Sequence, residues 1–381
     1  MLPLNWQRVR LGDIAEIKRG ASPRPIENPK WFCTNSNVGW VRISDISKNS
    51  RFLYKTAQKL SKKGIEKSRF IKQNSLIMSM CATIGKPIIT KIDTCIHDGF
   101  VVFENPKIDL NYLYYFLCYI EKEWLESGQQ GSQVNLNVDL IKNKEVFCPK
   151  DLNEQIAIAN ILSGLDRYLY NLDALILKKE SVKKALSFEL LSQRKRLKGF
   201  NQAWQRVRLG DIAEIKRGVR ITKNELDVFG KYPVVSGGVG FLGYTNNFNR
   251  YENTITIAQY GTAGYVNFQK NKFWANDVCF CIYPNKDIIK NIFLYYFLKV
   301  NQNYLYEISN RNATPYSISK DKILDFEIPL PPLNEQIAIA NILSGLDNEI
   351  ISLKNKKRQF ENIKKALNHD LMSAKIRVLK K

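Results

Sequence analysis

The chain has 381 residues, 44% hydrophobic and 11% aromatic, which is enough for two or three domains with substantial cores. Its 58 Lys and Arg against 36 Asp and Glu give a net charge of +22. An excess of this size favours a polyanionic partner such as nucleic acid over the alternative of a merely soluble basic protein. The longest apolar runs, such as residues 112–120, are too short to cross a bilayer, which needs about 20 residues.

The cysteines and histidines argue against several classes of site. The seven cysteines show no CxxC pair, which predicts reduced thiols and a cytoplasmic protein. The N-terminus lacks the apolar core of a signal peptide. His97 and His369 are the only histidines and lie far apart in the sequence, so we expect neither a metal site nor a histidine-based triad.

Two blocks occur twice without change. WQRVRLGDIAEIKRG stands at residues 6–20 and 204–218, and LNEQIAIANILSGLD stands at residues 152–166 and 333–347. The stretches between them, residues 21–150 and 219–332, hardly resemble each other. A constant–variable–constant pattern that is repeated predicts a two-unit architecture.

The first variable region combines extended segments with one aromatic helix. The apolar, β-branched composition and the glycine punctuation predict strands at residues 40–46, 76–80, 84–91 and 99–103. Residues 110–125 favour a helix, and residues 127–137 form a polar loop with five amide side chains.

The first long helix begins in the repeated block. Pro149 precedes it, Asn153 is a favourable N-cap and Glu154 suits the first turn. The helix is expected to run to about Gln193, followed by a basic linker over residues 193–199. Its apolar residues follow a 3–4 spacing typical of a coiled coil, with a seam at Leu162, Leu165, Leu169 and Leu172.

The second half repeats this plan with different residues. Strands are predicted at residues 232–235, 254–258 and 278–283, and a helix at residues 292–298 shares LYYFL with residues 113–117. A polar loop at residues 309–319 takes the place of the amide-rich loop. The second long helix, capped by Asn334, is expected to run to about Lys375, with its seam at Leu343, Leu346, Ile350 and Leu353.

The economical partner for each long helix is the other one, because neither can bury its apolar seam alone. The alternative is two helices on separate cores. Antiparallel pairing is our prediction, since it relates the two units by a pseudo-twofold axis. Differences along the seam, such as Lys179 against Phe360, would help each helix select the other copy. Gly164 and Gly345 lie inside the helices, and close approach of another backbone, with a partner protein as a candidate, would explain them.

Motifs of catalysis are weak or absent. GVGFLG at residues 238–243 matches GxGxxG, but the following YTNNFNR is a poor helix start, which argues against a dinucleotide site. Gly85–Lys86 lacks the first glycine of a phosphate-binding loop. No amino-methyltransferase tetrapeptide and no carboxylate–lysine cluster of a nuclease is found, so a catalytic role for this chain is not expected.

Taken together, these blocks resemble the specificity subunits of type I restriction–modification systems. The doubled P-x-x-EQ-x-x-I-A-x-x-L-x-x-LD helix start and the doubled opening at Trp6 and Trp204 carry the resemblance, which covers essentially the whole chain. Proline spacing differs, because Pro149 lies three residues before Leu152 whereas Pro332 abuts Leu333. The resemblance implies an α+β protein in which two mixed α/β target recognition domains are joined by two long helices in an antiparallel coiled coil. We place the first domain at residues 1–150 and its helix at 151–199, and the second domain at 200–332 and its helix at 333–381.

The function that the resemblance implies is non-catalytic DNA recognition. Each domain would bind half of a bipartite double-stranded target, while the helices set the spacer and dock two modification subunits. Those partners would hold S-adenosylmethionine, and two restriction/motor subunits would add cleavage; this chain itself would need no cofactor or metal. The alternatives are a self-sufficient DNA-modifying enzyme and a coiled-coil adaptor.

Polar side chains in the variable loops are the candidates for base reading, because Arg suits guanine and Gln or Asn suits adenine. In the first region they are Arg42, Ser79, Thr83, Lys86, Gln130, Gln133 and Asn135. In the second they are Ser236, Gln259, Tyr260, Thr262, Arg311 and Tyr316. The alternative for each is a phosphate contact or a role in holding the loop.

Overall fold

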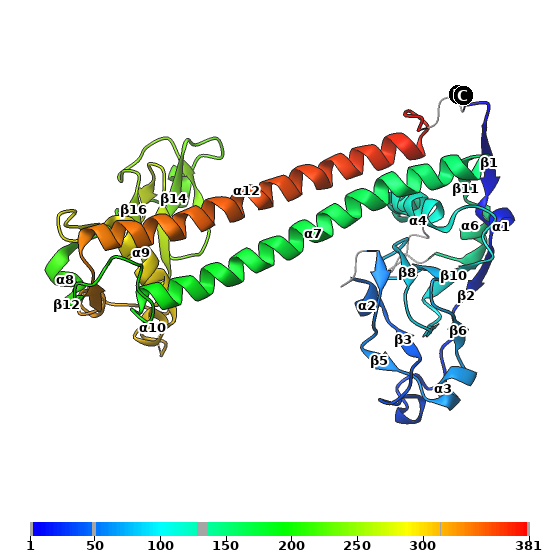
Figure 1. Ribbon diagram of the computed structural model, residues 1–381, viewed down its shortest axis with the longest axis horizontal. Helices are drawn as coiled ribbons and strands as arrows, with labels where there is room; N and C mark the ends of the chain where they lie inside the picture. The colour runs from blue at the N-terminus through cyan, green and yellow to red at the C-terminus, as the bar shows by residue number, and fades with distance from the viewer. Residues whose placement is uncertain (1–2, 48–50, 128–135, 313, 379–381) are drawn as a thin grey trace. The chain divides into compact units, whose positions relative to one another are not determined.

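The computed structural model describes residues 3–47, 51–127, 136–312 and 314–378 (Figure 1). The chain forms two compact units, one made of residues 1–172 and 356–381 and the other of residues 173–355. Two 40-residue helices, α7 (Leu152–Leu191) and α12 (Leu333–Met372), each contribute to both units. In the described part of the chain no helix is both long and apolar enough to cross a membrane.

The first unit is built on a five-stranded sheet in the order β2-β10-β7-β8-β4. A four-stranded sheet, β5-β3-β9-β6, and the pair β1-β11 complete it. The strands are β1 (Trp6–Arg10), β2 (Glu16–Arg19), β3 (Gly39–Val41), β4 (Phe52–Leu53), β5 (Gln58–Lys59), β6 (Arg69–Ile71), β7 (Leu76–Ser79), β8 (Pro87–Thr90), β9 (Thr94–Ile96), β10 (Phe100–Glu104) and β11 (Glu145–Pro149). Its short helices are α1 (Leu11–Ile14), α2 (Ile43–Ser47), α3 (Lys62–Glu66), α4 (Leu110–Tyr119), α5 (Glu121–Ser127) and α6 (Val138–Asn143), with a 3-10 turn at Pro29–Trp31.

The second unit repeats the central part of this sheet in the order β13-β19-β16-β17, with β15-β14-β18 and β12-β20 beside it. Its strands are β12 (Gln205–Arg208), β13 (Ala213–Arg217), β14 (Tyr232–Val235), β15 (Phe241–Thr245), β16 (Thr254–Ala258), β17 (Val266–Gln269), β18 (Trp274–Ala275), β19 (Cys279–Pro284) and β20 (Glu327–Leu330). Its short helices are α8 (Leu209–Ile212), α9 (Asn291–Val300), α10 (Gln302–Glu307) and α11 (Lys320–Leu324), with a 3-10 turn at Lys223–Glu225. The two variable regions therefore share one skeleton despite their unlike sequences.

Each sheet packs against an aromatic helix and a segment of the long helices. In the first unit, buried residues of β10 and β7 and aromatic residues of α4 share a core with Ile158 and Leu162 of α7. In the second, β16, β19 and α9 share a core with Ile339 and Leu343 of α12. The apolar face of each repeated block thus anchors a variable region to its helix.

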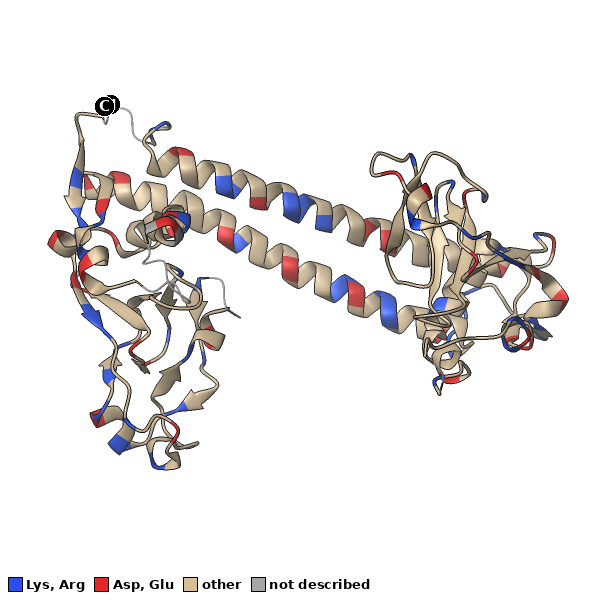
Figure 2. Ribbon diagram, turned by 180° about the vertical axis from the view of Figure 1, so that it is seen from behind, with Lys and Arg blue, Asp and Glu red and all other residues tan. Residues whose placement is uncertain are grey.

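The two long helices run antiparallel within each unit, as predicted. In the first unit, Asp166 and Tyr168 of α7 contact Lys364 and Phe360 of α12, in reverse order along the two helices. In the second, Lys179 and Lys183 of α7 pair with Glu349 and Asp347 of α12, again in reverse order. The seam residues are buried or half-buried, with Leu162, Leu172, Leu343 and Ile350 no more than 6% exposed. Both helices carry Lys and Arg as well as Asp and Glu along their length (Figure 2).

Some local predictions are wrong. Residues 43–47 form helix α2 rather than extending a strand from residue 40, because the buried Asp45 carboxylate accepts from the backbone N–H of Arg42 and of Ala57. Residues 110–125 form two helices, α4 and α5, with Ile120 between them. Strand β8 begins only at Pro87, because residues 80–86 form a loop.

The helix starts also differ from the predicted caps. Both long helices begin one residue before the predicted N-cap, so Asn153 and Asn334 lie inside them. In the first copy the Asp151 side chain accepts from the N–H of Asn153 instead. A Cβ added at Gly164 or Gly345 would have nothing within 4 Å among the described residues, so close approach within this chain does not explain either glycine.

Candidate nucleic-acid interface

Two equivalent loops link the second and third strands of the repeated sheet motif. Residues 80–86 join β7 to β8, and residues 259–265 join β16 to β17. Gly85 donates its N–H to the Ser79 carbonyl at 2.9 Å, and Gly264 donates to the Ala258 carbonyl at 2.8 Å. Both glycines have positive φ, 76° and 87°, which L side chains rarely adopt. The same backbone turn therefore presents different side chains in the two units.

Each loop rests on the turn that precedes the central strand. Met80 donates its N–H to the Gly99 carbonyl, and Gln259 donates to the Val278 carbonyl, both at 2.8 Å. These carbonyls belong to the turns 97–99 and 276–278, which lead into β10 and β19. The loop and the turn form the common framework of the candidate interface in each unit.

In the second unit, three segments distant in sequence meet at this framework. Thr262 donates through Oγ1 to the Gly237 carbonyl at 2.6 Å, which joins the loop to the segment after β14. Tyr260 forms a bridge with Ser317, and Gly261 donates its N–H to the Tyr316 carbonyl at 3.0 Å. The structure therefore brings residues 236–237, 259–262 and 316–317 together.

The predicted readers of the second region line this junction. Ser236 Oγ accepts from Asn276 Nδ2 at 3.2 Å. The Arg311 guanidinium lies 5.5 Å from the ring centroids of both Tyr306 and Tyr316. Gln259 is half-buried, and its Oε1 is buried without a hydrogen-bond partner in the described part of the chain. The exposed Arg311 and Tyr316 side chains offer hydrogen-bond donors that suit a base edge, whereas the Gln259 oxygen is shielded from solvent.

In the first unit the predicted base-reading residues differ in their exposure. Thr83 and Lys86 are half-exposed on the loop, while Ser79 is fully buried and its hydroxyl donates to the Thr83 carbonyl. Ser79 therefore supports the loop from inside the unit. Gln130, Gln133 and Asn135 lie outside the described residues.

Arg42 stands at the end of β3 and donates to Gln58 Oε1 at 3.4 Å. It lies close enough to the turn for its charge to act on His97. Burial chiefly lowers the pKa of His97, Arg42 adds to this, and Asp98 opposes it. The structure thus places Arg42 at the end of β3 and not on the loop 80–86.

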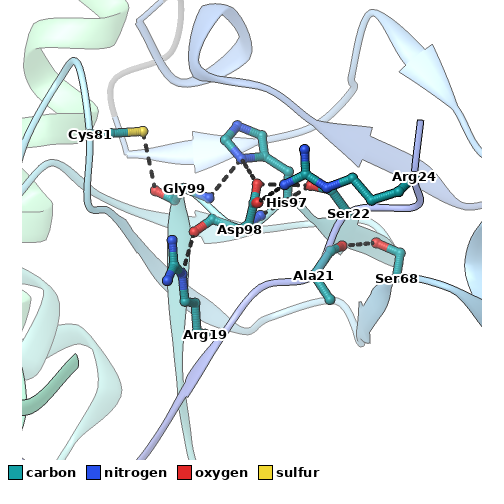
Figure 3. Close-up of polar contacts among 9 residues, drawn as sticks. All are labelled: Arg19, Ala21, Ser22, Arg24, Ser68, Cys81, His97, Asp98 and Gly99. Carbon is teal, nitrogen blue, oxygen red and sulfur yellow. Dashed lines mark hydrogen bonds and ion pairs between the residues drawn. The ribbon is translucent and has the colours of Figure 1, made fainter. Parts of the chain in front are cut away.

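The turn 97–99 gathers polar side chains, but it is not arranged as a nucleophile–base pair (Figure 3). His97 Nδ1 accepts the Gly99 N–H at 2.8 Å. Ser22 Oγ donates to the Asp98 carboxylate at 2.9 Å, and Arg24 pairs with the same carboxylate. Burial tends to raise the pKa of Asp98, but the Ser22 hydrogen bond and the Arg24 charge hold it below its ordinary value. Serine and histidine therefore share Asp98 without facing each other, unlike a catalytic triad.

A second repeated arrangement fixes each domain on its helix. Tyr115 donates its hydroxyl to Asp166, and Tyr296 donates to Asp347 at 2.7 Å. These aspartates end the identical fifteen-residue blocks, and the tyrosines belong to the shared LYYFL segments. Burial first, and then the aspartate, raises the pKa of Tyr115 and of Tyr296.

The pairing predicted for the seam is asymmetric in one place. Tyr168 contacts Phe360 with ring centroids 4.6 Å apart in the first unit. In the second unit Lys179 pairs with Glu349 at 2.8 Å. Tyr168 is equivalent to Glu349 in the repeat, and Lys179 is equivalent to Phe360. The same place in the helix pair therefore holds two aromatic rings in one unit and an ion pair in the other, which distinguishes the two helices.

A family model for the type I restriction modification DNA specificity domain matches residues 3–179 and again residues 201–362. The chain belongs to this family. It is 23% identical over 357 residues to the type I restriction enzyme EcoprrI specificity subunit of Escherichia coli, covering 88% of this chain and 86% of that protein. It is 25% identical over 419 residues to the type I restriction enzyme MjaVIII specificity subunit of Methanocaldococcus jannaschii, covering 99% and 94%.

The fold agrees with this membership. The crystal structure of a type I restriction–modification system S subunit from M. genitalium superposes with a TM-score of 0.68 at 19% identity, covering 97% of this chain and 98% of that one. The two specificity domains of the family correspond to the two repeats seen in the sequence.

Sequence reasoning missed the residues that hold the interface together. Asn276 supports Ser236, and Asn310 exchanges backbone hydrogen bonds with Ser317. Asn276 could have been noticed as the equivalent of His97, before the shared Asp of each turn. Nothing in the sequence indicates the pairing of Asn310 with Ser317.

Proposed function

We propose that the chain is the DNA sequence-specificity subunit of a type I restriction–modification complex, and that each recognition domain binds one half of a bipartite double-stranded target. The observation that carries this is the repeated framework of loop and turn, which presents unlike side chains in two otherwise equivalent units. One scaffold with two surfaces suits one protein that reads two different half-sites. Action on genomic DNA would place the protein in the cytoplasm.

The side chains around Tyr260 support contact with bases. Arg311 and Gln259 offer guanidinium donors and an amide, the groups that discriminate guanine and adenine in the major groove. The other candidates would complete the two surfaces, with Thr83, Lys86 and Arg42 in the first unit and Ser236, Thr262 and Tyr316 in the second. The net charge of +22 supplies the sequence-independent attraction to phosphate.

The helices would dock two modification subunits and set the spacer between the half-sites. Ile156 and its equivalent Ile337 are 38% and 42% exposed, and Ile161 and Ile342 are 40% and 37% exposed. These matched apolar residues occur on identical blocks, which suits two copies of one partner. Gly164 and Gly345 lie on the same blocks and leave room for a close approach.

The chain itself would be non-catalytic. S-adenosylmethionine and the flipped adenine would be held by the modification subunits, and two restriction/motor subunits would add cleavage. The test is methyl transfer from labelled S-adenosylmethionine to genomic DNA by the purified chain, with and without its modification subunits. We expect transfer only with both present; transfer by the chain alone would refute the proposal in favour of a self-sufficient enzyme.

A further inference from the structure

Each variable region begins directly after an identical Lys-Arg-Gly segment, at residues 18–20 and 216–218. The glycine has a structural reason. A Cβ at Gly20 would stand 2.0 Å from the His97 carbonyl oxygen, and one at Gly218 would stand 2.0 Å from that of Asn276. The arginine before it, Arg19 or Arg217, is exposed in both units.

Both arginines are held in the same way. Arg19 donates through Nε to the Asp98 carbonyl oxygen at 2.7 Å, as Figure 3 shows, and Arg217 donates through Nε to the Asp277 carbonyl oxygen. The acceptors are neutral backbone groups, and in the described part of the chain neither guanidinium forms an ion pair. Each arginine is therefore oriented by its Nε, while its charge and its two terminal amino groups stay available for an anion.

Unlike sequences converge on this arrangement. A second arginine donates to the backbone carbonyl of the first: Arg69 to that of Arg19, and Arg250 to that of Arg217, the latter at 2.8 Å. Arg69 begins strand β6, whereas Arg250 lies in the connection between β15 and β16. In each unit, therefore, a second guanidinium group contacts the backbone of the first arginine. The second arginine comes from a different segment of the chain in the two units.

This point lies beside the loops that carry the reading side chains. In the first unit the Cys81 thiol of the loop 80–86 donates to the Gly99 carbonyl at 3.9 Å, and Arg19 donates to the carbonyl of the preceding residue, Asp98. In the second unit Asp277, which holds Arg217, precedes Val278, whose carbonyl accepts from Gln259. An anion bound at either arginine would therefore lie next to the base-reading surface.

We infer that Arg19 and Arg217 are phosphate anchors, one in each recognition domain, which fix the register of the DNA backbone independently of its sequence. The inference rests on the proposed function and adds residues to it. A guanidinium presents paired donors that match two phosphate oxygens, whereas discrimination between bases is left to the unlike loops. Anchors shared by the two repeats beside unlike loops would let each domain read a different target while keeping the same alignment on the duplex.

The test uses the full-length chain and a duplex of about 40 base pairs of arbitrary sequence, with the dissociation constant measured against salt concentration. Arg19→Gln and Arg217→Gln are compared with Arg206→Gln. Arg206 is an exposed arginine of the same repeated block, and it pairs with Glu327 at 3.5 Å. The slope of log K against log salt is negative, and losing one phosphate contact makes it shallower by about 0.9. The advantage of the wild type should therefore shrink about 3.5-fold between about 50 and about 200 mM salt, and about 12-fold for the double variant.

Two further readouts separate an anchor from other roles. Arg19→Lys and Arg217→Lys keep the charge but lose the Nε hydrogen bond. Because the salt dependence follows the charge, these variants should retain most of the wild-type slope that the Gln variants lose. In selection from randomised duplexes, Arg217→Gln should recover the wild-type motif at lower affinity. A changed motif would show that Arg217 reads a base, and a slope equal to that of Arg206→Gln would show that it touches no phosphate; either overturns the inference while leaving the proposed function intact. A wild-type chain without salt-dependent DNA binding would instead refute the proposed function.

Discussion

The start of α12 depends on a buried ion pair whose loss should destabilise the second unit. The Glu335 side chain is fully buried and accepts from Arg196 Nε at 3.0 Å, from Arg196 Nη2 at 2.7 Å and from Trp204 Nε1 at 2.9 Å. Glu335→Ala leaves the Arg196 charge largely buried without a partner. Breaking such a pair costs roughly 3–5 kcal/mol, and because Arg196 is 23% exposed we expect the lower end, about 3 kcal/mol.

The assay is differential scanning calorimetry of the full chain. For a unit of this size about 3 kcal/mol corresponds to a fall of roughly 6–12 °C in the transition of the second unit. The matched control is Glu349→Ala, because Glu349 and its partner Lys179 are 44% and 31% exposed and the pair should contribute about 0–1 kcal/mol. Arg196→Met combined with Glu335→Leu should recover most of the stability, since an apolar pair leaves no buried charge. Equal losses for Glu335→Ala and Glu349→Ala would refute the reasoning.

Three further predictions concern recognition. Arg311→Ala should relax one base position of the second half-site, with a discrimination loss of about 1–3 kcal/mol in duplex-binding competition; a uniform loss over all sequences would identify a phosphate contact instead. Exchanging residues 21–150 for the corresponding region of another family member should change one half of the methylated target, mapped by methylation-sensitive sequencing, and a change in both halves would contradict modular reading. The half-sites should lie about one helical turn apart, roughly 34–36 Å. Inserting four helical residues within residues 187–191 should lengthen α7 by roughly 6 Å. At about 3.4 Å per base pair the spacer should then grow by one or two base pairs. Unchanged methylation of the original spacing would show that the helices do not set it.

The large-scale architecture could be predicted because short, contiguous patterns in the sequence specify it. Fifteen-residue identities reveal the two-unit plan, and the 3–4 spacing of leucines extends over enough turns to identify paired helices. The antiparallel direction is predicted because it relates two equal units by a pseudo-twofold axis. Successive contacts between α7 and α12 within each unit confirm it. The shared LYYFL segments likewise indicated that both variable regions use one skeleton.

The finer structure could not be predicted, because it depends on partners far apart in the chain. Asp45 reshapes residues 43–47 by accepting a hydrogen bond from Ala57, and no propensity of residues 40–46 contains that information. Ser79 resembled a reader by residue type, but its neighbours bury it. From the sequence alone, Glu154 and its equivalent Glu335 suit the first turn of a helix. The structure shows that each is buried against an arginine and a tryptophan.

The central claim is that two unlike recognition surfaces on one repeated scaffold read a bipartite DNA target. Selection of the full-length chain, assembled with its modification subunits, against duplexes carrying a long randomised segment tests it most directly. The account predicts enrichment of two short, different half-sites separated by an unspecified spacer of constant length. A single continuous motif, or binding without any sequence enrichment, would contradict it.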